Sequence, residues 1–213
     1  MSGKTRVLIA DDHAIIRQGI KLILSHAPDM EVTGEADCST RTLQLLRESP
    51  FDVVLLDISL PDRSGIDTLK LVRKEFPKLP VLMLSMHPEE LYAIRALRAG
   101  AAGYLSKQGA PEQVVTAIRQ VASGRKFVSA AVAEELASAI SEDASRPLHE
   151  KLSDREYQTL CLIASGHTLT QIGEELNLSV KTVSVYRARL LEKMKLRNNA
   201  ELTHYGLKHG LVE

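Results

Sequence analysis

The stretch Phe51-Asp52-Val53-Val54-Leu55-Leu56-Asp57 places four consecutive aliphatic residues directly before an aspartate. An uninterrupted run of this kind is typical of a strand that is covered on both faces of a parallel sheet. A second apolar run begins at Val7 and ends at Asp11-Asp12. Parallel α/β sheets bind ligands at the carboxyl ends of their strands, so we expect the three carboxylates to share one edge.

Five apolar segments of strand length alternate with helical segments over residues 1–125, and this alternation favours an α/β fold with a doubly wound parallel sheet. The fifth helical segment opens at Pro111, a residue typical of the first helical turn. The expected strands lie near residues 6–10, 31–35, 52–56, 80–84 and 102–105.

A hydroxyl and an ammonium are expected at the same edge of the sheet as the three acids, because Ser85 follows the fourth strand and Lys107 follows the fifth. Crowded carboxylates repel one another and retain protons unless a cation neutralises them. Three hard oxygen donors suit Mg2+, which keeps several water ligands and accepts phosphate oxygens. A hydroxyl and an ammonium facing three acids therefore indicate a site for a metal ion and a phosphoryl group.

Taken singly, each of these residues has a simpler structural explanation. A strand-ending aspartate such as Asp57 is often a turn residue or a helix cap, and Asp11-Asp12 precede a helix that they would cap. Lys107 alone would be a solvated surface residue. Only the five residues together, each in its strand position, favour chemistry over packing.

In these five residues the chain resembles the receiver domain of bacterial two-component response regulators, across residues 1–125. The resemblance implies a flavodoxin-like five-stranded sheet of strand order 2-1-3-4-5. It also implies that a sensor histidine kinase phosphorylates Asp57 as the carboxylate nucleophile. The metal ligands would then be Asp11, Asp12, Asp57 and the backbone carbonyl of Ser59.

The remaining roles in the site follow the same resemblance. Lys107 would pair with the phosphoryl oxygens, and Ser85 would hydrogen-bond one of them. Tyr104 is either a half-buried aromatic residue of an edge strand or a switch residue that moves inward when Ser85 engages the phosphoryl group.

Two other functional classes share parts of this pattern. A magnesium-dependent phosphohydrolase with an aspartyl-phosphate intermediate also places an Asp, a Lys and a hydroxyl on such a sheet, but its second Asp, two residues after the nucleophile, is replaced here by Ser59. A receiver that switches by protein contact alone is the other alternative. The intact acids argue against it, whereas the long side chain of Met86, beside Ser85, favours it.

Length and composition indicate two domains in a cytoplasmic protein. A chain of 213 residues exceeds the usual size of one domain. The two cysteines, Cys38 and Cys161, form no metal or disulfide pattern, and the start shows neither signal peptide nor membrane span. Seven histidines show no ligand spacing, so we predict that they are structural or exposed.

A linker is expected between the two domains, over residues 126–148. Within it, Ser129–Ile140 has the apolar spacing of a helix, with Val132, Leu136 and Ile140 on one face. Residues 141–147 are polar and poor in large apolar groups, as in an exposed linker.

Residues 149–213 read as an all-α domain of short helices. Ser153-Asp154-Arg155-Glu156 and Thr168-Leu169-Thr170-Gln171 are capping boxes, and Gly166 fits a left-handed helix end. A helix from about Thr170 to Leu176 is followed by a tight turn and a longer helix that ends near Met194, which is a helix-turn-helix pattern.

This segment resembles the four-helix LuxR-type DNA-binding domain of the NarL/FixJ response regulators. The match is carried by Leu152–Glu156, Gly166, Ile172-Gly173, Leu178-Ser179, Lys181-Thr182-Val183 and Lys193-Met194. It implies binding of promoter DNA as a homodimer, with a last helix near Asn199–His209 at the dimer interface, and RNA polymerase as a further partner.

The longer helix of this domain is the expected recognition helix. Residues 179–197 contain six basic side chains and one acidic one although the whole chain has no net charge. A solvated helix face would explain such a stripe alone, but the helix-turn-helix pattern favours DNA. The residues predicted to contact DNA are Lys181, Thr182, Ser184, Val185, Arg187, Ala188 and Arg189.

Overall fold

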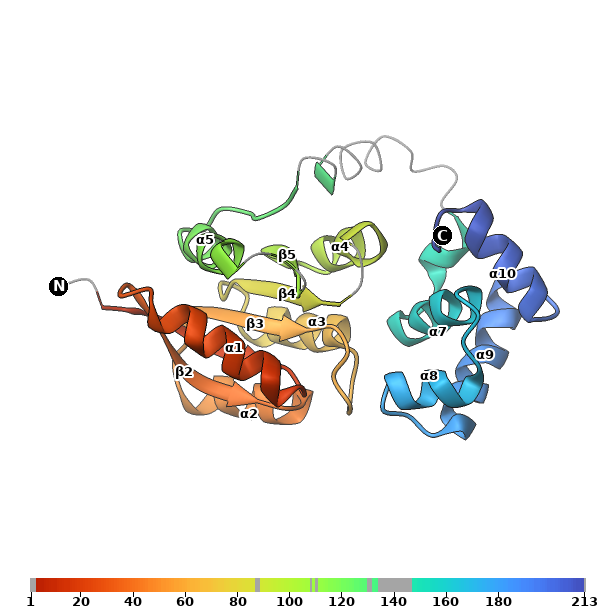
Figure 1. Ribbon diagram of the computed structural model, residues 1–213, viewed down its shortest axis with the longest axis horizontal. Helices are drawn as coiled ribbons and strands as arrows, with labels where there is room; N and C mark the ends of the chain where they lie inside the picture. The colour runs from red at the N-terminus through yellow and green to blue at the C-terminus, as the bar shows by residue number, and fades with distance from the viewer. Residues whose placement is uncertain are drawn as a thin grey trace. The chain divides into compact units, whose positions relative to one another are not determined.

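The computed structural model describes residues 3–86, 89–107, 109, 111–129, 132–133 and 147–212, with the backbone alone at residues 89–91. The chain divides into two compact units, Met1–Ser138 and Ala139–Glu213. Figure 1 draws the helices and strands of both units and labels most of them. Among the described residues, none of the helices has the length and apolar character needed to cross a bilayer.

The first unit contains a five-stranded parallel sheet of order β2-β1-β3-β4-β5. This confirms the predicted doubly wound fold and strand order, and each strand begins within one residue of its predicted start. The strands are β1 (Thr5–Ala10), β2 (Met30–Ala36), β3 (Val53–Asp57), β4 (Val81–Ser85) and β5 (Gly103–Ser106). The helices are α1 (Ala14–Ser25), α2 (Ser39–Glu48), α3 (Gly65–Glu75), α4 (Glu89–Arg98) and α5 (Pro111–Ala122).

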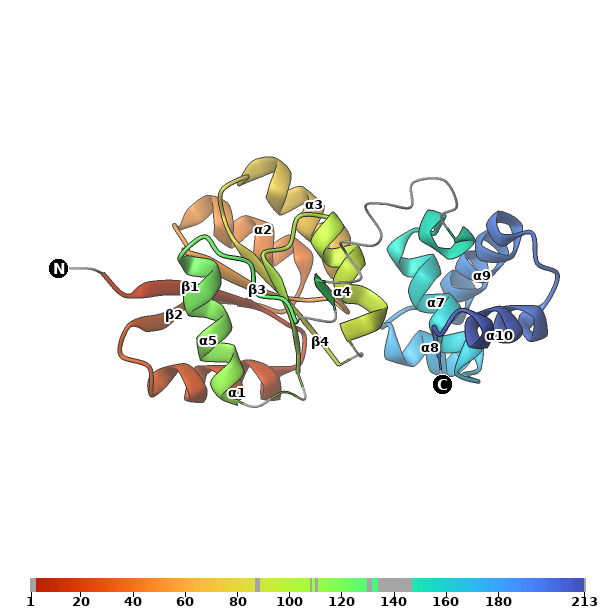
Figure 2. The same cartoon turned by 90° about the horizontal axis from the view of Figure 1, so that it is seen from above.

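Helices cover both faces of this sheet, which explains its continuous apolar strands. Figure 2 shows α1 and α5 on one side and α2, α3 and α4 on the other. On the α1/α5 side, Ile20 and Leu24 of α1 join Ile118 of α5 in a core with alternate residues of the strands. The four aliphatic residues of β3 are fully buried, so the polar Asp57 lies at the end of an otherwise apolar strand.

The loop between β3 and α3 runs very close to the backbone of Asp57. A Cβ atom added at Gly65, the first residue of α3, would lie 1.9 Å from the carbonyl oxygen of Asp57. The Gly65 N–H donates to the carbonyl of Ile58 at 2.8 Å and closes the loop. Glycine is therefore required here so that α3 can start beside the carboxyl end of β3.

The second unit is helical in its described part, Pro147–Val212. Both predicted capping boxes are present, and Gly166 has the expected left-handed conformation, with φ of +88°. Its core is formed by fully buried aliphatic side chains from successive helices, including Leu160, Ile172 and Leu202. The elements are the 3-10 helix η1 (Leu148–Lys151), α7 (Asp154–Ala164), α8 (Leu169–Glu175), α9 (Val180–Met194) and α10 (Asn199–Lys208).

A tight turn joins α8 to α9. Asn177 adopts a left-handed conformation with φ of +52°, and the N–H of Leu178 donates to the carbonyl of Gly173 at 2.7 Å. A Cβ atom at Gly173 would lie 2.7 Å from the Leu178 carbonyl oxygen, so only glycine allows this approach. Ser179 then caps α9 by accepting a hydrogen bond from the backbone N–H of Thr182.

The predicted connection between the units falls largely outside the described residues. Of the expected helix Ser129–Ile140, the structure describes Ser129, Val132 and Ala133, and Val132 is buried. The polar segment 141–147 is described only at Pro147. The linker and the exact domain boundaries therefore remain predictions.

Candidate functional site

An ion-pair cluster is buried at the carboxyl edge of the sheet. Asp57 ends β3, Asp11 follows β1 and Lys107 follows β5, so three strands deliver these side chains. The Lys107 ammonium lies 2.7 Å from Asp11 Oδ2 and 2.8 Å from Asp57 Oδ2. Each of the three side chains is at most 2% exposed. The sequence prediction that they meet at one edge is confirmed, and Lys107 is not a solvated surface residue.

This environment works against the ionised form of Asp57. Burial raises the pKa of the Asp57 carboxyl above its ordinary value, and the charge of Asp11 raises it further. The Lys107 ammonium and the backbone N–H of Ser59 lower the same pKa without cancelling the rise. An additional cation at this edge would favour the carboxylate, which is the form that can act as a nucleophile.

The donor set at the edge fits a divalent metal ion. Asp11, Asp12, His13 and Asp57 each offer a ligand atom, and these atoms lie within 4.8 Å of one another. Carboxylate oxygens are the ligands that Mg2+ prefers, and a partly hydrated ion needs only one or two of them. His13 was not predicted to belong to this site. Its place directly after the acid pair was the available signal.

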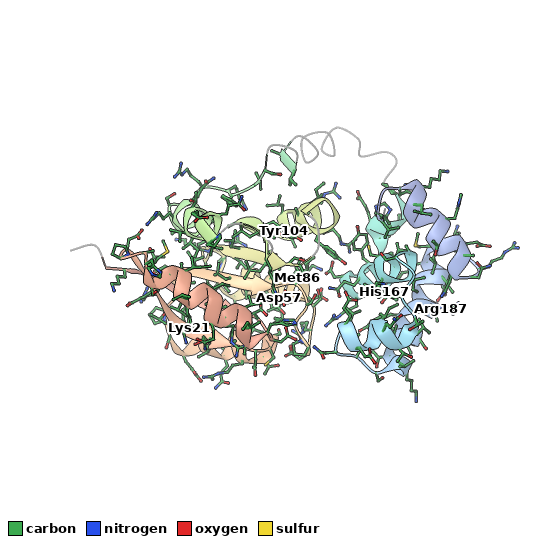
Figure 3. All side chains as sticks on the ribbon, viewed as in Figure 1. Lys21, Asp57, Met86, Tyr104, His167 and Arg187 are labelled. Carbon is green, nitrogen blue, oxygen red and sulfur yellow. The ribbon has the colours of Figure 1, made fainter. Side chains whose placement is uncertain are left out.

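Ser85 and Tyr104 lie inside the protein on the two neighbouring strands. Ser85, at the end of β4, is 1% exposed, and Tyr104, in β5, is 2% exposed. Of the two alternatives for Tyr104, the half-buried one is wrong, because the ring is enclosed although β5 is an edge strand, and the role as a switch residue stays a prediction. Met86 is 53% exposed, so its side chain lies mostly in solvent. Figure 3 labels Asp57, Met86 and Tyr104.

In the second unit, α9 has one buried face and one exposed face. Val183, Leu190 and Met194 of this helix are buried, whereas Tyr186 on the same side is only partly buried. The opposite face is exposed at Lys181, Ser184, Val185, Ala188 and Arg189. Val185, an apolar residue among those predicted to contact DNA, keeps 45% of its surface exposed.

Comparison with known protein families matches both units. Residues 7–119 match the family described as response regulator receiver domain, and residues 150–206 match the family described as bacterial regulatory proteins, luxR family. The chain is a two-component response regulator of the NarL/FixJ type. It is a phosphorylation-dependent transcriptional regulator rather than a classical enzyme.

Relatives of this response regulator match along almost its whole length. Response regulator UvrY of Escherichia coli (strain K12) is 38% identical over 206 residues, which cover 96% of this chain and 94% of UvrY. Response regulator GacA of Pseudomonas aeruginosa is 36% identical over 210 residues, covering 98% of each chain. RcsB of Salmonella enterica serovar Typhimurium, solved on the rprA promoter with the phosphomimetic BeF3-, has a TM-score of 0.63 and 29% identity, covering 95% of this chain and 98% of RcsB.

Two residues of the response regulator, neither predicted from the sequence, hold the loops around the acids. Asp62, in the β3–α3 loop, accepts hydrogen bonds from the backbone N–H groups of Ser39 (2.8 Å) and Thr40 (2.9 Å) at the start of α2. Burial alone would raise the pKa of Asp62, but these donors lower it below its ordinary value. Arg17 donates from Nη1 to the backbone carbonyl of Asp11 at 2.7 Å.

In this response regulator, α9, the helix expected to contact DNA, is fixed to its neighbours by two side-chain contacts. The Lys193 ammonium lies 2.6 Å from Glu156 Oε2 in α7. Burial alone would raise the pKa of Glu156, but hydrogen bonds from Lys193 and Ser153 lower it below its ordinary value. Arg187 donates from Nε to Asn199 Oδ1 in α10 at 2.6 Å. The contact of Arg187 connects the expected DNA-binding helix to the last helix.

Proposed function

We propose that this regulator accepts a phosphoryl group on Asp57 from a sensor histidine kinase and, once phosphorylated, binds promoter DNA as a homodimer through α9. The observation that carries the first step is the buried cluster in which Lys107 lies within 2.8 Å of both Asp11 and Asp57. This cluster joins a nucleophile, a second acid and a fixed cation at one strand edge. We place the protein in the cytoplasm, where it meets promoter DNA.

The transfer step is a displacement at phosphorus. A carboxylate oxygen of Asp57 attacks the phosphorus of the kinase phosphohistidine, the N–P bond breaks, and its electron pair returns to the imidazole nitrogen. The product is an acyl phosphate. Lys107 then moves from a carboxylate partner to a phosphoryl oxygen as a point charge, and the buried Ser85 hydroxyl donates to another oxygen.

Asp11, Asp12, Asp57 and the Ser59 carbonyl would hold Mg2+, which neutralises negative charge on the carboxylates and the phosphoryl oxygens. Slow hydrolysis returns the site to its starting state, because water attacks the phosphorus and releases inorganic phosphate and the Asp57 carboxylate. Tyr104 is already enclosed in the structure. When Ser85 hydrogen-bonds the phosphoryl group, Tyr104 would transmit this change to the surface around β5.

The DNA-binding step rests on the exposed face of α9. Lys181 and Arg189 would contact phosphates, while Ser184, Val185 and Ala188 would face the bases in the major groove. Thr182 has its hydroxyl 2.8 Å from that of Ser179, so it would act at the capped start of the helix. Helix N-termini bind phosphates well.

The Nε of Arg187 already donates to Asn199, so Arg187 would contact a phosphate only through the remaining N–H groups of its guanidinium. Pairing of two chains through α10 would bring two copies of α9 to adjacent half-sites, and RNA polymerase is then a further partner at the promoter.

The test of the phosphoacceptor is intact-mass spectrometry after incubation with acetyl phosphate and Mg2+. The wild-type protein is expected to gain one phosphoryl group, and Asp57→Asn to gain none. Asp52→Asn is the matched control. Asp52 lies just before the start of β3, where it pairs with Arg6 and is remote from the acid cluster at the end of the strand. Labelling of Asp57→Asn equal to that of the control would show that another residue is the acceptor.

A further inference from the structure

His13 has its imidazole directed at the acid site rather than at the helix that it precedes. His13 occupies the N-cap position of α1, yet its side chain makes no capping hydrogen bond. Instead Nδ1 lies 2.7 Å from Asp12 Oδ1 and 3.2 Å from Asp11 Oδ1. The imidazole is therefore paired with the two carboxylates of the acid site and does not serve as the cap of α1.

The backbone fixes the ring at this place. The N–H of His13 donates to Asp11 Oδ1 at 2.9 Å, so the residue is held beside the first acid by both main chain and side chain. The side chain of His13 remains 57% exposed while that of Asp11 is fully buried. The ring thus lies on the solvent side of the acid cluster.

We propose that His13 contributes a nitrogen ligand to this site and thereby raises its affinity for borderline divalent ions such as Co2+ and Zn2+ relative to Mg2+. This inference rests on the proposed metal-dependent function of the same acids. The ligand atoms of Asp11, Asp12, His13 and Asp57 lie within 4.8 Å of one another, close enough to surround one ion.

The chemistry of the four donors separates the two classes of ion. Mg2+ selects oxygen ligands and gains little from an imidazole, whereas imidazole suits Zn2+ and its transition-metal neighbours. For a given site with nitrogen and oxygen donors, affinity rises from Mn2+ through Co2+ and stays high at Zn2+. Removing His13 should therefore weaken Zn2+ far more than Mg2+.

The test uses the full-length protein loaded with Mn2+, with the bound ion followed by electron paramagnetic resonance. Only the Mn2+ that excess Mg2+ displaces is assigned to the acid site. In the wild type, electron spin echo modulation of this ion is expected to show coupling to a 14N nucleus, and His13→Ala should lose it. Competition then gives the Zn2+ and Mg2+ concentrations that displace half of the Mn2+.

For His13→Ala, the Zn2+ affinity relative to Mg2+ is expected to fall by about tenfold or more, the scale seen when a metal site loses an interacting side chain. His26→Ala is the control, because His26 lies at the other end of α1 and its ring contacts only the Leu22 carbonyl among the described hydrogen bonds. Absent nitrogen coupling in the wild type, or an equal loss for Zn2+ and Mg2+, overturns the inference. Phosphorylation of Asp57 is measured independently on the wild type with Mg2+. A failure of the proposed phosphorylation can therefore be distinguished from a failure of the proposed His13 ligand.

Discussion

Replacement of Lys107 by methionine tests the electrostatics of the acid cluster. Methionine fills much of the volume of the lysine stem but removes the ammonium, which lies 2.7 Å from Asp11 and 2.8 Å from Asp57. Two buried carboxylates are then left facing each other without their cation. We expect Lys107→Met to destabilise the first unit strongly when no divalent ion is present.

The magnitude follows from two limits. Removing one partner of a buried ion pair costs about 3–5 kcal/mol, because the remaining charge stays buried. Protonation of one carboxyl relieves the repulsion between the two acids, and at pH 7 it costs about 4 kcal/mol for an acid with an ordinary pKa of ~3.9. We therefore expect a loss of about 3–4 kcal/mol at pH 7, a large share of the ~5–15 kcal/mol of a typical domain.

The loss should shrink as the pH falls. Burial and the charge of Asp11 already raise the pKa of Asp57, and removal of Lys107 raises it further. A group whose pKa is higher in the folded state favours folding below its unfolded pKa, and this contribution disappears as the pH rises through the folded pKa. At pH 5 the cost of protonation is only about 1.5 kcal/mol, so the deficit of the variant should fall to about that value.

The assay is urea unfolding in EDTA at pH 5 and pH 7, followed by pulse hydrogen exchange and mass spectrometry of β3 peptides. These peptides report the first unit separately from the second. Lys21→Met is the control, because Lys21 pairs with Glu35 at the surface and has 39% of its side chain exposed. We expect this variant to lose less than about 1 kcal/mol of unfolding free energy. Equal deficits for the two variants, or a Lys107→Met deficit that grows toward pH 5, would refute this reasoning.

Three further outcomes are expected. Glu156→Gln should cost about 1–2 kcal/mol at neutral pH in unfolding of the second unit, since the hydrogen bond from Lys193 loses its negatively charged acceptor. Because the pKa of Glu156 is lowered in the folded state, this difference is present above the unfolded pKa and disappears as the pH falls through the folded value, and an acid titration of stability that stays parallel for both proteins contradicts it. In binding titrations over a salt series, Arg189→Ala should lower the affinity for all DNA sequences about equally and reduce the slope of log affinity against log salt by ~1. Val185→Ala should instead relax the preference at one base pair, at a cost of ~1 kcal/mol. A uniform loss of affinity for both variants would argue against separate phosphate and base contacts. Beryllofluoride should shift light scattering toward dimers and raise DNA affinity by the ~1–3 kcal/mol typical of allosteric coupling, and the switch has no support if neither quantity changes.

The fold of both units was predictable because its signals are local. Continuous apolar runs, the proline at the start of α5 and two capping boxes each act within a few residues, and the structure contains all of them. The strand order is a different kind of result, since it came from resemblance to a known family and not from periodicity. The meeting of Asp11 and Asp57 was also predictable, because neighbouring parallel strands end at the same edge.

Tertiary structure alone decided which side chains contact one another within that edge. The direct pairing of Lys107 with both acids, the enclosure of Tyr104 and the approach of His13 depend on side-chain conformations that the position of a residue along a strand does not specify. Asp62 reaches α2 across more than twenty residues of chain, and the contact from Arg187 to Asn199 joins two helices. Sequence patterns establish which residues lie at one end of an element. The packing of the elements then sets the distances that give those residues their charge state and their partners.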